Sequence, residues 1–188
     1  MTRSLAARAA GEAVGTFLLV GIGTGAIVVA HRIGGVPSWA VAIAWFFAVL
    51  LPILLFVNGT GAHLNPAVTL ALAGSGRFSW RRVPAYLTGQ LAGALLASGI
   101  LRGVLGDVAR LGSTTPTGDL LRAFAGEAVF TAALVASVFL LSDRGAGLGR
   151  WRLLLPPGVV GISTYVIGPW SGSSLNPART LGPAIVSG

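Results

Sequence analysis

The sequence contains HLNPAVTLAL at residues 63–72 and SLNPARTLGPA at residues 174–184. Both segments carry an Asn-Pro-Ala tripeptide. Asparagine is a favoured helix N-cap and proline is favoured at the first helical position, so each tripeptide predicts the start of a helix. The apolar stretches that follow, 66–74 and 177–186, are too short to cross a bilayer, which takes about 20 residues. They are predicted to be re-entrant half-helices, which begin at the tripeptides Asn65-Pro66-Ala67 and Asn176-Pro177-Ala178.

A second repetition agrees with the first. GEAVGTF at residues 11–17 returns as GEAVFTA at residues 126–132, an offset of 115, and the two tripeptides are offset by 111. The chain therefore reads as a duplication, and each unit is predicted to run helix, helix, half-helix, helix. An odd number of full spans inverts the second unit, so the two half-helices are expected to meet at the membrane midplane.

We divide the chain accordingly. Residues 1–105 form the first repeat, with two spans, the half-helix 66–74 and a third span. Residues 106–119 form a linker on the outer side. Residues 120–188 form the second repeat, with two spans, the half-helix 177–186 and no third span.

The composition indicates an all-α integral membrane protein. Hydrophobic residues make up 54% of the 188 residues and charged residues only 10%, and the mean hydropathy is +0.82. Soluble domains carry charges on about a quarter of their residues. The expected spans are 9–30, 39–57, 84–105, 120–142 and 153–168.

The charges suggest an orientation. All thirteen basic residues are arginines, and the formal net charge is +8. No basic run exceeds the pair Arg81-Arg82, which argues against a nucleic-acid partner. With a cytoplasmic N-terminus, the inner segments hold eight arginines, Arg3 and Arg144 among them, and the outer segments four, as the positive-inside rule requires. We expect a multi-pass protein of a bacterial plasma membrane.

Enzymatic chemistry finds little support. The chain has no cysteine and two histidines, and it shows no nucleophile paired with a base, no phosphate-binding loop and no metal-ligand cluster. We therefore expect neither an enzyme, nor a metal site, nor a cofactor.

The meeting point of two half-helices has predictable electrostatics. Each helix N-terminus carries about half a positive charge, so the pair repels cations and hydronium. The amides of Asn65 and Asn176 are expected to donate hydrogen bonds to a passing oxygen. Non-helical backbone at this depth requires a protein-lined or water-filled cavity, so the sequence predicts a passage for polar neutral molecules.

These motifs resemble the aquaporin, or major intrinsic protein, family. The residues that carry the resemblance are GEAVGTF with GEAVFTA, the two Asn-Pro-Ala segments and Gln90 in the third span. The resemblance covers nearly the whole chain. It implies a passive channel for water or small uncharged solutes, usually a homotetramer in the lipid bilayer with one pore per protomer.

The resemblance also implies a selectivity filter toward the outer side, made of Trp45, Thr164, Ser173 and Arg179. A guanidinium has five donors and a permanent charge, so Arg179 would orient a solute and repel cations. Two alternatives stay open: Arg179 as an interfacial anchor and Trp45 as a lipid-facing aromatic.

The filter composition points in two directions. Tryptophan at the first position resembles glycerol facilitators, and Thr164 leaves more room than the histidine of water-selective members. Glycerol facilitators, however, carry aspartate after the filter arginine, whereas this chain has Thr180, and Ala184 resembles the water-channel pattern. We expect water plus small neutral solutes, with glycerol, urea, ammonia and uncharged metalloid acids as candidates.

Two acids fall within apolar spans, Glu12 and Glu127. An intramembrane carboxylate is a candidate proton relay. In the family it resembles, such a residue instead accepts hydrogen bonds from the loop backbone leading to each half-helix. Gln90 and His63 fit the same supporting role, and a pH-sensing role for His63 stays open.

The chain departs from the family pattern at its end. The family has six full spans, and this chain stops at Gly188, so we expect a fragment or a truncated protein. Two alternatives to the channel are a secondary transporter with inverted repeats, which would need an ionisable coupling site, and a non-conducting membrane scaffold.

Overall fold

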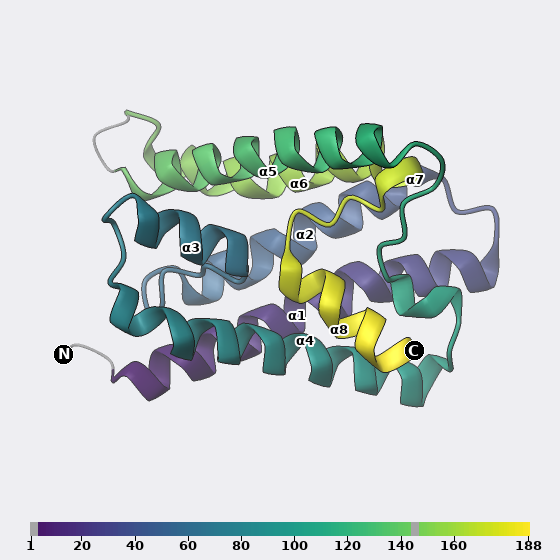
Figure 1. Ribbon diagram of the computed structural model, residues 1–188, viewed down its shortest axis with the longest axis horizontal. Helices are drawn as coiled ribbons and strands as arrows, with labels where there is room; N and C mark the ends of the chain where they lie inside the picture. The colour runs from purple at the N-terminus through teal and green to yellow at the C-terminus, as the bar shows by residue number, and fades with distance from the viewer. Residues whose placement is uncertain (1–3, 144–146) are drawn as a thin grey trace.

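The computed structural model describes residues 4–143 and 147–188, and each regular element in these two ranges is helical. Arg3 and Arg144, two of the expected inner charges, lie outside the described residues. Figure 1 shows a bundle whose long helices run along one axis. In chain order the elements are α1 (Leu5–Ile33), α2 (Ser38–Phe56), α3 (Pro66–Gly74), η1 (Trp80–Arg82), α4 (Val83–Leu105), η2 (Ala109–Gly112), α5 (Leu120–Ser142), η3 (Gly149–Leu154), α6 (Leu155–Val166), α7 (Gly168–Ser171) and α8 (Pro177–Ser187).

Within the described residues, four helices are long and apolar enough to cross a membrane: α1, α2, η1 with α4, and α5. The expected span 153–168 is not one continuous helix. It consists of the 12-residue α6, preceded by the 3-10 helix η3 and followed by the short α7. Prolines explain the breaks, because the pair Pro156-Pro157 stands in the first turn of α6 and the single Pro169 in the first turn of α7.

The two half-helices lie end to end in the middle of the bundle. Figure 1 shows α3 and α8 with their N-termini facing each other, α3 running toward the end of the molecule where α1 begins and α8 running toward the opposite end. We call these the N-terminal end and the opposite end. The half-helices have 9 and 11 residues, about 14 and 17 Å at 1.5 Å per residue. Each therefore covers about half of a hydrocarbon core.

Large apolar side chains face outward on the long helices. Leu96, Val104, Phe124 and Val129 are exposed, whereas the interior holds most of the polar residues that line or support the central loops. Exposed apolar surface of this extent is unfavourable in water and favourable against lipid tails.

Close packing between α1 and α4 depends on small residues. Gly89 and Gly93 lie four residues apart on the face of α4 that meets α1. A Cβ atom added to Gly93 would lie 2.9 Å from the carbonyl carbon of Ala13. Such small-residue spacing lets two helix backbones approach closely in a membrane, where packing rather than water exclusion joins helices.

Gly93→Ala is expected to destabilise the bundle by about 1–3 kcal/mol, since the added methyl group must push α1 away from α4. Gly99→Ala is the matched control, because a Cβ on Gly99 meets no atom within 4 Å. There alanine should be neutral or stabilising by up to about 1 kcal/mol through its helix propensity. Thermal unfolding in detergent, followed by circular dichroism, measures both. Equal midpoints for the two variants would contradict the packing argument.

Candidate conduction pathway

The two Asn side chains are both caps and cross-links. Asn65 Oδ1 accepts from Ala67 N at 2.8 Å, and Asn176 Oδ1 accepts from Ala178 N at 3.0 Å, which caps α3 and α8. The amide nitrogens bond across the centre: Asn65 Nδ2 donates to the Leu175 carbonyl at 2.8 Å and Asn176 Nδ2 donates to the Leu64 carbonyl at 2.9 Å. Each amide nitrogen has two hydrogens, so one is used between the loops and one is left for a molecule in the passage.

The approach to each half-helix has the same unusual backbone. Residues three and one before each capping asparagine have positive φ although none is glycine: Ala62 at 49° and Leu64 at 56°, Ser173 at 47° and Leu175 at 51°. Such conformations cost about 1–3 kcal/mol each and persist only where the surroundings hold them. The positive φ angles fall at matching positions in both loops, so the two repeats approach their half-helices with the same backbone conformation.

Two carboxylates hold these loops through equivalent bonds. Glu12 accepts from His63 N at 3.0 Å and Leu64 N at 2.7 Å. Glu127 accepts from Ser174 N and Leu175 N, both at 2.9 Å. The acceptors satisfy backbone N–H groups that no helix or sheet pairs, which otherwise would be costly inside a membrane.

The network around Glu12 is larger than the one around Glu127. Glu12 is fully buried and also accepts from Thr60 Oγ1 at 2.6 Å and Gln90 Nε2 at 2.8 Å. Gln90 Nε2 further donates to Thr69 Oγ1 at 2.9 Å, and the His63 ring lies 3.2 Å from the same hydroxyl. Glu127 is only half-buried. Within the described residues, its hydrogen bonds are the two to the loop backbone.

Three of the four predicted filter residues meet in one cavity. Trp45, Thr164 and Arg179 line a cavity of about 350 Å³ at the opposite end of the molecule. The Thr164 hydroxyl donates to the Val160 carbonyl at 2.9 Å. Ser173 does not line this cavity. Its hydroxyl donates to Ser163 Oγ at 2.8 Å.

Arg179 is held from three directions. Its side chain is 1% exposed, its Nη1 donates to the Gly112 carbonyl at 2.8 Å, and its Cζ lies 4.8 Å from the centre of the Trp45 ring. A weaker bond of 3.5 Å joins Nη2 to the Gly172 carbonyl. Sequence reasoning missed both carbonyls, because backbone acceptors leave no residue-type signal. The linker that carries Gly112 is thus part of the site.

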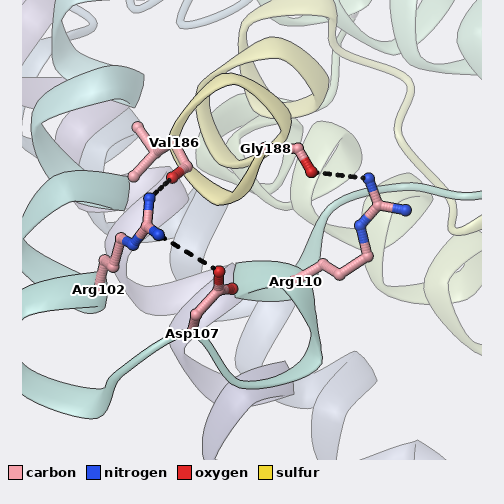
Figure 2. Close-up of polar contacts among 5 residues, drawn as sticks. All are labelled: Arg102, Asp107, Arg110, Val186 and Gly188. Carbon is pink, nitrogen blue, oxygen red and sulfur yellow. Dashed lines mark hydrogen bonds and ion pairs between the residues drawn. The ribbon is translucent and has the colours of Figure 1, made fainter.

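The end of α4 and the linker together hold the C-terminal end of α8. Figure 2 shows Arg102 donating through Nη1 to the Val186 carbonyl and Arg110 donating through Nη2 to the Gly188 carbonyl at 3.4 Å. Arg102 also lies 3.6 Å from Asp107 in an ion pair. Positive side chains at a helix C-terminus pair its free carbonyls and offset its partial negative charge.

The first half-helix ends differently. Backbone N–H groups of Arg77 and Phe78 both bond the Leu72 carbonyl, at 2.9 and 3.0 Å, after Gly76 at φ 73°. Glycine adopts this left-handed conformation without steric cost, so α3 is capped by its own chain. The ends of α3 and α8 are therefore stabilised by different means.

Three cavities follow one another through the molecule. A wide one of about 500 Å³ lies at the N-terminal end, a narrow one of about 40 Å³ lies in the centre, and the cavity of about 350 Å³ lies at the opposite end. The narrow cavity shares His63, Val138 and Leu141 with the first and Trp45 and Arg179 with the last.

The narrow centre determines what the passage tolerates chemically. Asn65 and Asn176 line it together with apolar side chains such as Leu19, Val49 and Val160. Within residues 4–143 and 147–188, no Asp or Glu lines any of the three cavities. A cation in the centre would find two helix N-termini and the Arg179 charge, whereas a neutral hydrogen-bonding molecule would find donors and acceptors.

Comparison with known proteins gives consistent relationships. The model of the family described as major intrinsic protein matches residues 2–188. The aquaporin NIP1-3 of Oryza sativa subsp. japonica is 40% identical over 94% of this chain and 63% of its own length. Nodulin-26 of Glycine max is 35% identical over 94% of this chain and 66% of its own length. The chain thus spans about two thirds of the length of these relatives.

A solved structure agrees in fold. The aquaglyceroporin from Plasmodium falciparum is similar with a TM-score of 0.83 and 28% identity, over 98% of this chain and 81% of that one. The predicted family resemblance and the predicted all-α membrane fold are both confirmed. The chain belongs to the major intrinsic protein family.

Proposed function

We propose that the protein is a passive transmembrane channel for water and small neutral solutes that excludes ions and protons. The observation that carries the proposal is the succession of three cavities through the bundle, with Asn65 and Asn176 at the narrow centre and Arg179 at its border. Of the proteins named above, one is called an aquaporin and one an aquaglyceroporin, which supports the same function.

The roles of the site residues follow from their contacts. Asn65 and Asn176 bind the passing oxygen, and Trp45, Thr164 and Arg179 form the filter. Glu12 and Glu127 support the two loops, with Gln90 and His63 assisting Glu12. Ser173 is the fourth proposed filter residue, and its hydroxyl is bonded to Ser163.

The filter cavity leaves room for more than one water molecule. Thr164 presents a small side chain in the cavity that Trp45 also lines, and this cavity of about 350 Å³ exceeds what a single water molecule occupies. We propose water together with glycerol, urea, ammonia or uncharged metalloid acids as permeant molecules.

Thr164→His is expected to narrow conduction toward water. The imidazole fills the space opposite Trp45 and adds a donor, so glycerol and urea uptake should fall by about 10-fold or more, the size of one lost steric fit in a pocket, while water efflux stays within about two-fold. Stopped-flow light scattering on proteoliposomes measures all three fluxes. Thr164→Ser is the matched control and should retain solute uptake. Unchanged glycerol uptake in Thr164→His would remove Thr164 from the filter.

The direct test of the channel compares the chain with a plugged variant. Val49 lines the narrow central cavity, so Val49→Trp should fill it and abolish water efflux from proteoliposomes. Fast efflux in the unmodified chain and background efflux in Val49→Trp would support the channel. Background efflux in both would favour the non-conducting scaffold, and efflux that depends on an ion gradient would favour the secondary transporter.

Orientation, division and assembly belong to the same proposal. Arg77, Arg150 and Arg152 line the N-terminal-end cavity, which supports a cytoplasmic N-terminus in a plasma membrane.

We further propose the division into repeats 1–105 and 120–188 joined by 106–119. We also propose a homotetramer, which native mass spectrometry would test. A bacterial source stays a prediction, since the curated relatives named above are plant proteins.

A further inference from the structure

Three arginines converge on the wide cavity at the N-terminal end. Arg77 comes from the turn after α3, and Arg150 and Arg152 come from η3 of the second repeat. These positions are more than 70 residues apart in the sequence, yet they line the same cavity of about 500 Å³. Asn58 and Ser142 add neutral polar groups to its wall.

The wall of this cavity carries no acidic side chain. In the part of the chain that the structure describes, residues 4–143 and 147–188, no carboxylate lines it. Arg77 lies with its Cζ 4.3 Å from the centre of the Phe139 ring, and Arg150 lies 5.7 Å from that of Trp151. Stacking on a ring face leaves the N–H edge of a guanidinium free to bind an anion.

The proposed cargo does not explain the cluster. A neutral solute gains nothing from three like charges at the entrance, and like charges around one cavity repel one another. The positive-inside rule places arginines on the cytoplasmic side of the membrane, but it does not require them to line a cavity. Arg81 and Arg82 of η1 are expected on the same cytoplasmic side of the membrane. Both are exposed, and they line none of the three cavities.

We propose that this cavity is a binding site for a phosphate group, held by Arg77, Arg150 and Arg152. Arginine binds phosphate through two parallel N–H···O bonds, and a dianion would offset most of the clustered charge. The phosphate group can belong to inorganic phosphate or to the headgroup of a phosphomonoester lipid in the adjoining leaflet.

We further propose that occupation of the site narrows the passage at this end. The cavity that would hold the phosphate group adjoins the narrow centre, with which it shares His63, Val138 and Leu141, so a bound group reduces the space in front of the entrance. This narrowing rests on the proposed channel function, whereas the binding itself does not.

Binding is tested on the full chain with two variants of equal charge loss. The first double variant, Arg77→Gln with Arg152→Gln, removes two of the three arginines that line the cavity. The second, Arg81→Gln with Arg82→Gln, removes two exposed charges outside it. Isothermal titration of the detergent-purified protein with inorganic phosphate should show binding that is at least about 10-fold weaker in the first pair and unchanged in the second, because charged hydrogen bonds are lost only in the first. Equal weakening in both pairs would overturn the site.

A lipid arm distinguishes the source of the phosphate group. Nanodiscs with phosphatidic acid are compared with nanodiscs with phosphatidylserine by the thermal midpoint of the protein. Stabilisation by phosphatidic acid alone, lost in the Arg77/Arg152 variant, supports a lipid source, and titratable binding of inorganic phosphate supports a free one. If the unmodified chain shows neither, the proposal is wrong.

Narrowing is measured separately as water efflux from proteoliposomes with and without phosphate. Efflux that falls with phosphate in the unmodified chain, and not in the Arg77/Arg152 variant, supports narrowing. Binding without any loss of efflux overturns narrowing. Absence of efflux without phosphate contradicts the channel function instead, and leaves the binding result standing.

Discussion

Arg179→Ala is expected to make the passage permeable to protons and alkali cations. The guanidinium is the charged group at the border of the narrow cavity, and its side chain is 1% exposed. At about 4 Å and an effective dielectric constant near 20, a unit charge raises the energy of a cation by about 4 kcal/mol. Its removal should raise cation leak by about a hundredfold or more, while the half-helix N-termini keep part of the barrier.

Proton leak is measured on proteoliposomes with a pH-sensitive dye inside, driven by the membrane potential that valinomycin sets up from a potassium gradient between the buffers. Arg32→Ala is the matched control, because Arg32 is exposed and bonds the Leu105 carbonyl away from the passage. Its proton leak should equal that of the unmodified chain. If the Arg179→Ala variant leaked no more protons than the unmodified chain, the helix N-termini alone would exclude cations and Arg179 would act as an anchor.

Glu12→Ala is expected to be the most destabilising single change in the molecule. The substitution removes an acceptor from four donors: Thr60 Oγ1, His63 N, Leu64 N and Gln90 Nε2, of which Gln90 Nε2 keeps its bond to Thr69 Oγ1. Breaking a buried charged network in this way costs about 3–5 kcal/mol. The strained residues Ala62 and Leu64 also lose their restraint, so the α3 approach loop should rearrange.

Glu127→Ala is the comparison that isolates the wider network. Glu127 makes the equivalent two loop bonds, but the described structure shows no side-chain donors on it like Thr60 and Gln90 on Glu12, so fewer donors lose an acceptor. The expected cost is about 1–2 kcal/mol. Thermal midpoints of both variants in one detergent measure the difference. Equal shifts for Glu12→Ala and Glu127→Ala would show that the loop bonds, and not the wider network of Thr60 and Gln90, determine stability.

The helix starts illustrate what local chemistry determines. The sequence predicted half-helices 66–74 and 177–186, and the structure has α3 at Pro66–Gly74 and α8 at Pro177–Ser187. An asparagine cap followed by proline acts within one turn, so the sequence contains the whole signal. The expected span 153–168 was wrong as a continuous helix, because hydropathy outweighed the proline signals at Pro156-Pro157 and Pro169 that divide it.

The bonds across the centre required the folded chain. Each Asn amide binds a carbonyl about 110 residues away, and Arg179 binds Gly112, 67 residues away. Carbonyl partners carry no residue-type signal, so neither the Gly112 contact nor the capping of α8 by Arg102 and Arg110 could be predicted. Ser173, which the family resemblance implies as a filter residue, bonds through its hydroxyl to Ser163, a contact that the sequence does not indicate.

The sequence by itself determined the membrane class, the helix starts and the symmetric pair of Asn-Pro-Ala motifs, because apolar length, caps and proline act locally. Tertiary structure alone decided which of the two loop-binding acids became fully buried, which filter residues share a cavity, and that Arg77, Arg150 and Arg152 face one entrance. These outcomes depend on which surfaces the packed helices bring together. Burial and pairing are properties of such surfaces and not of any segment alone.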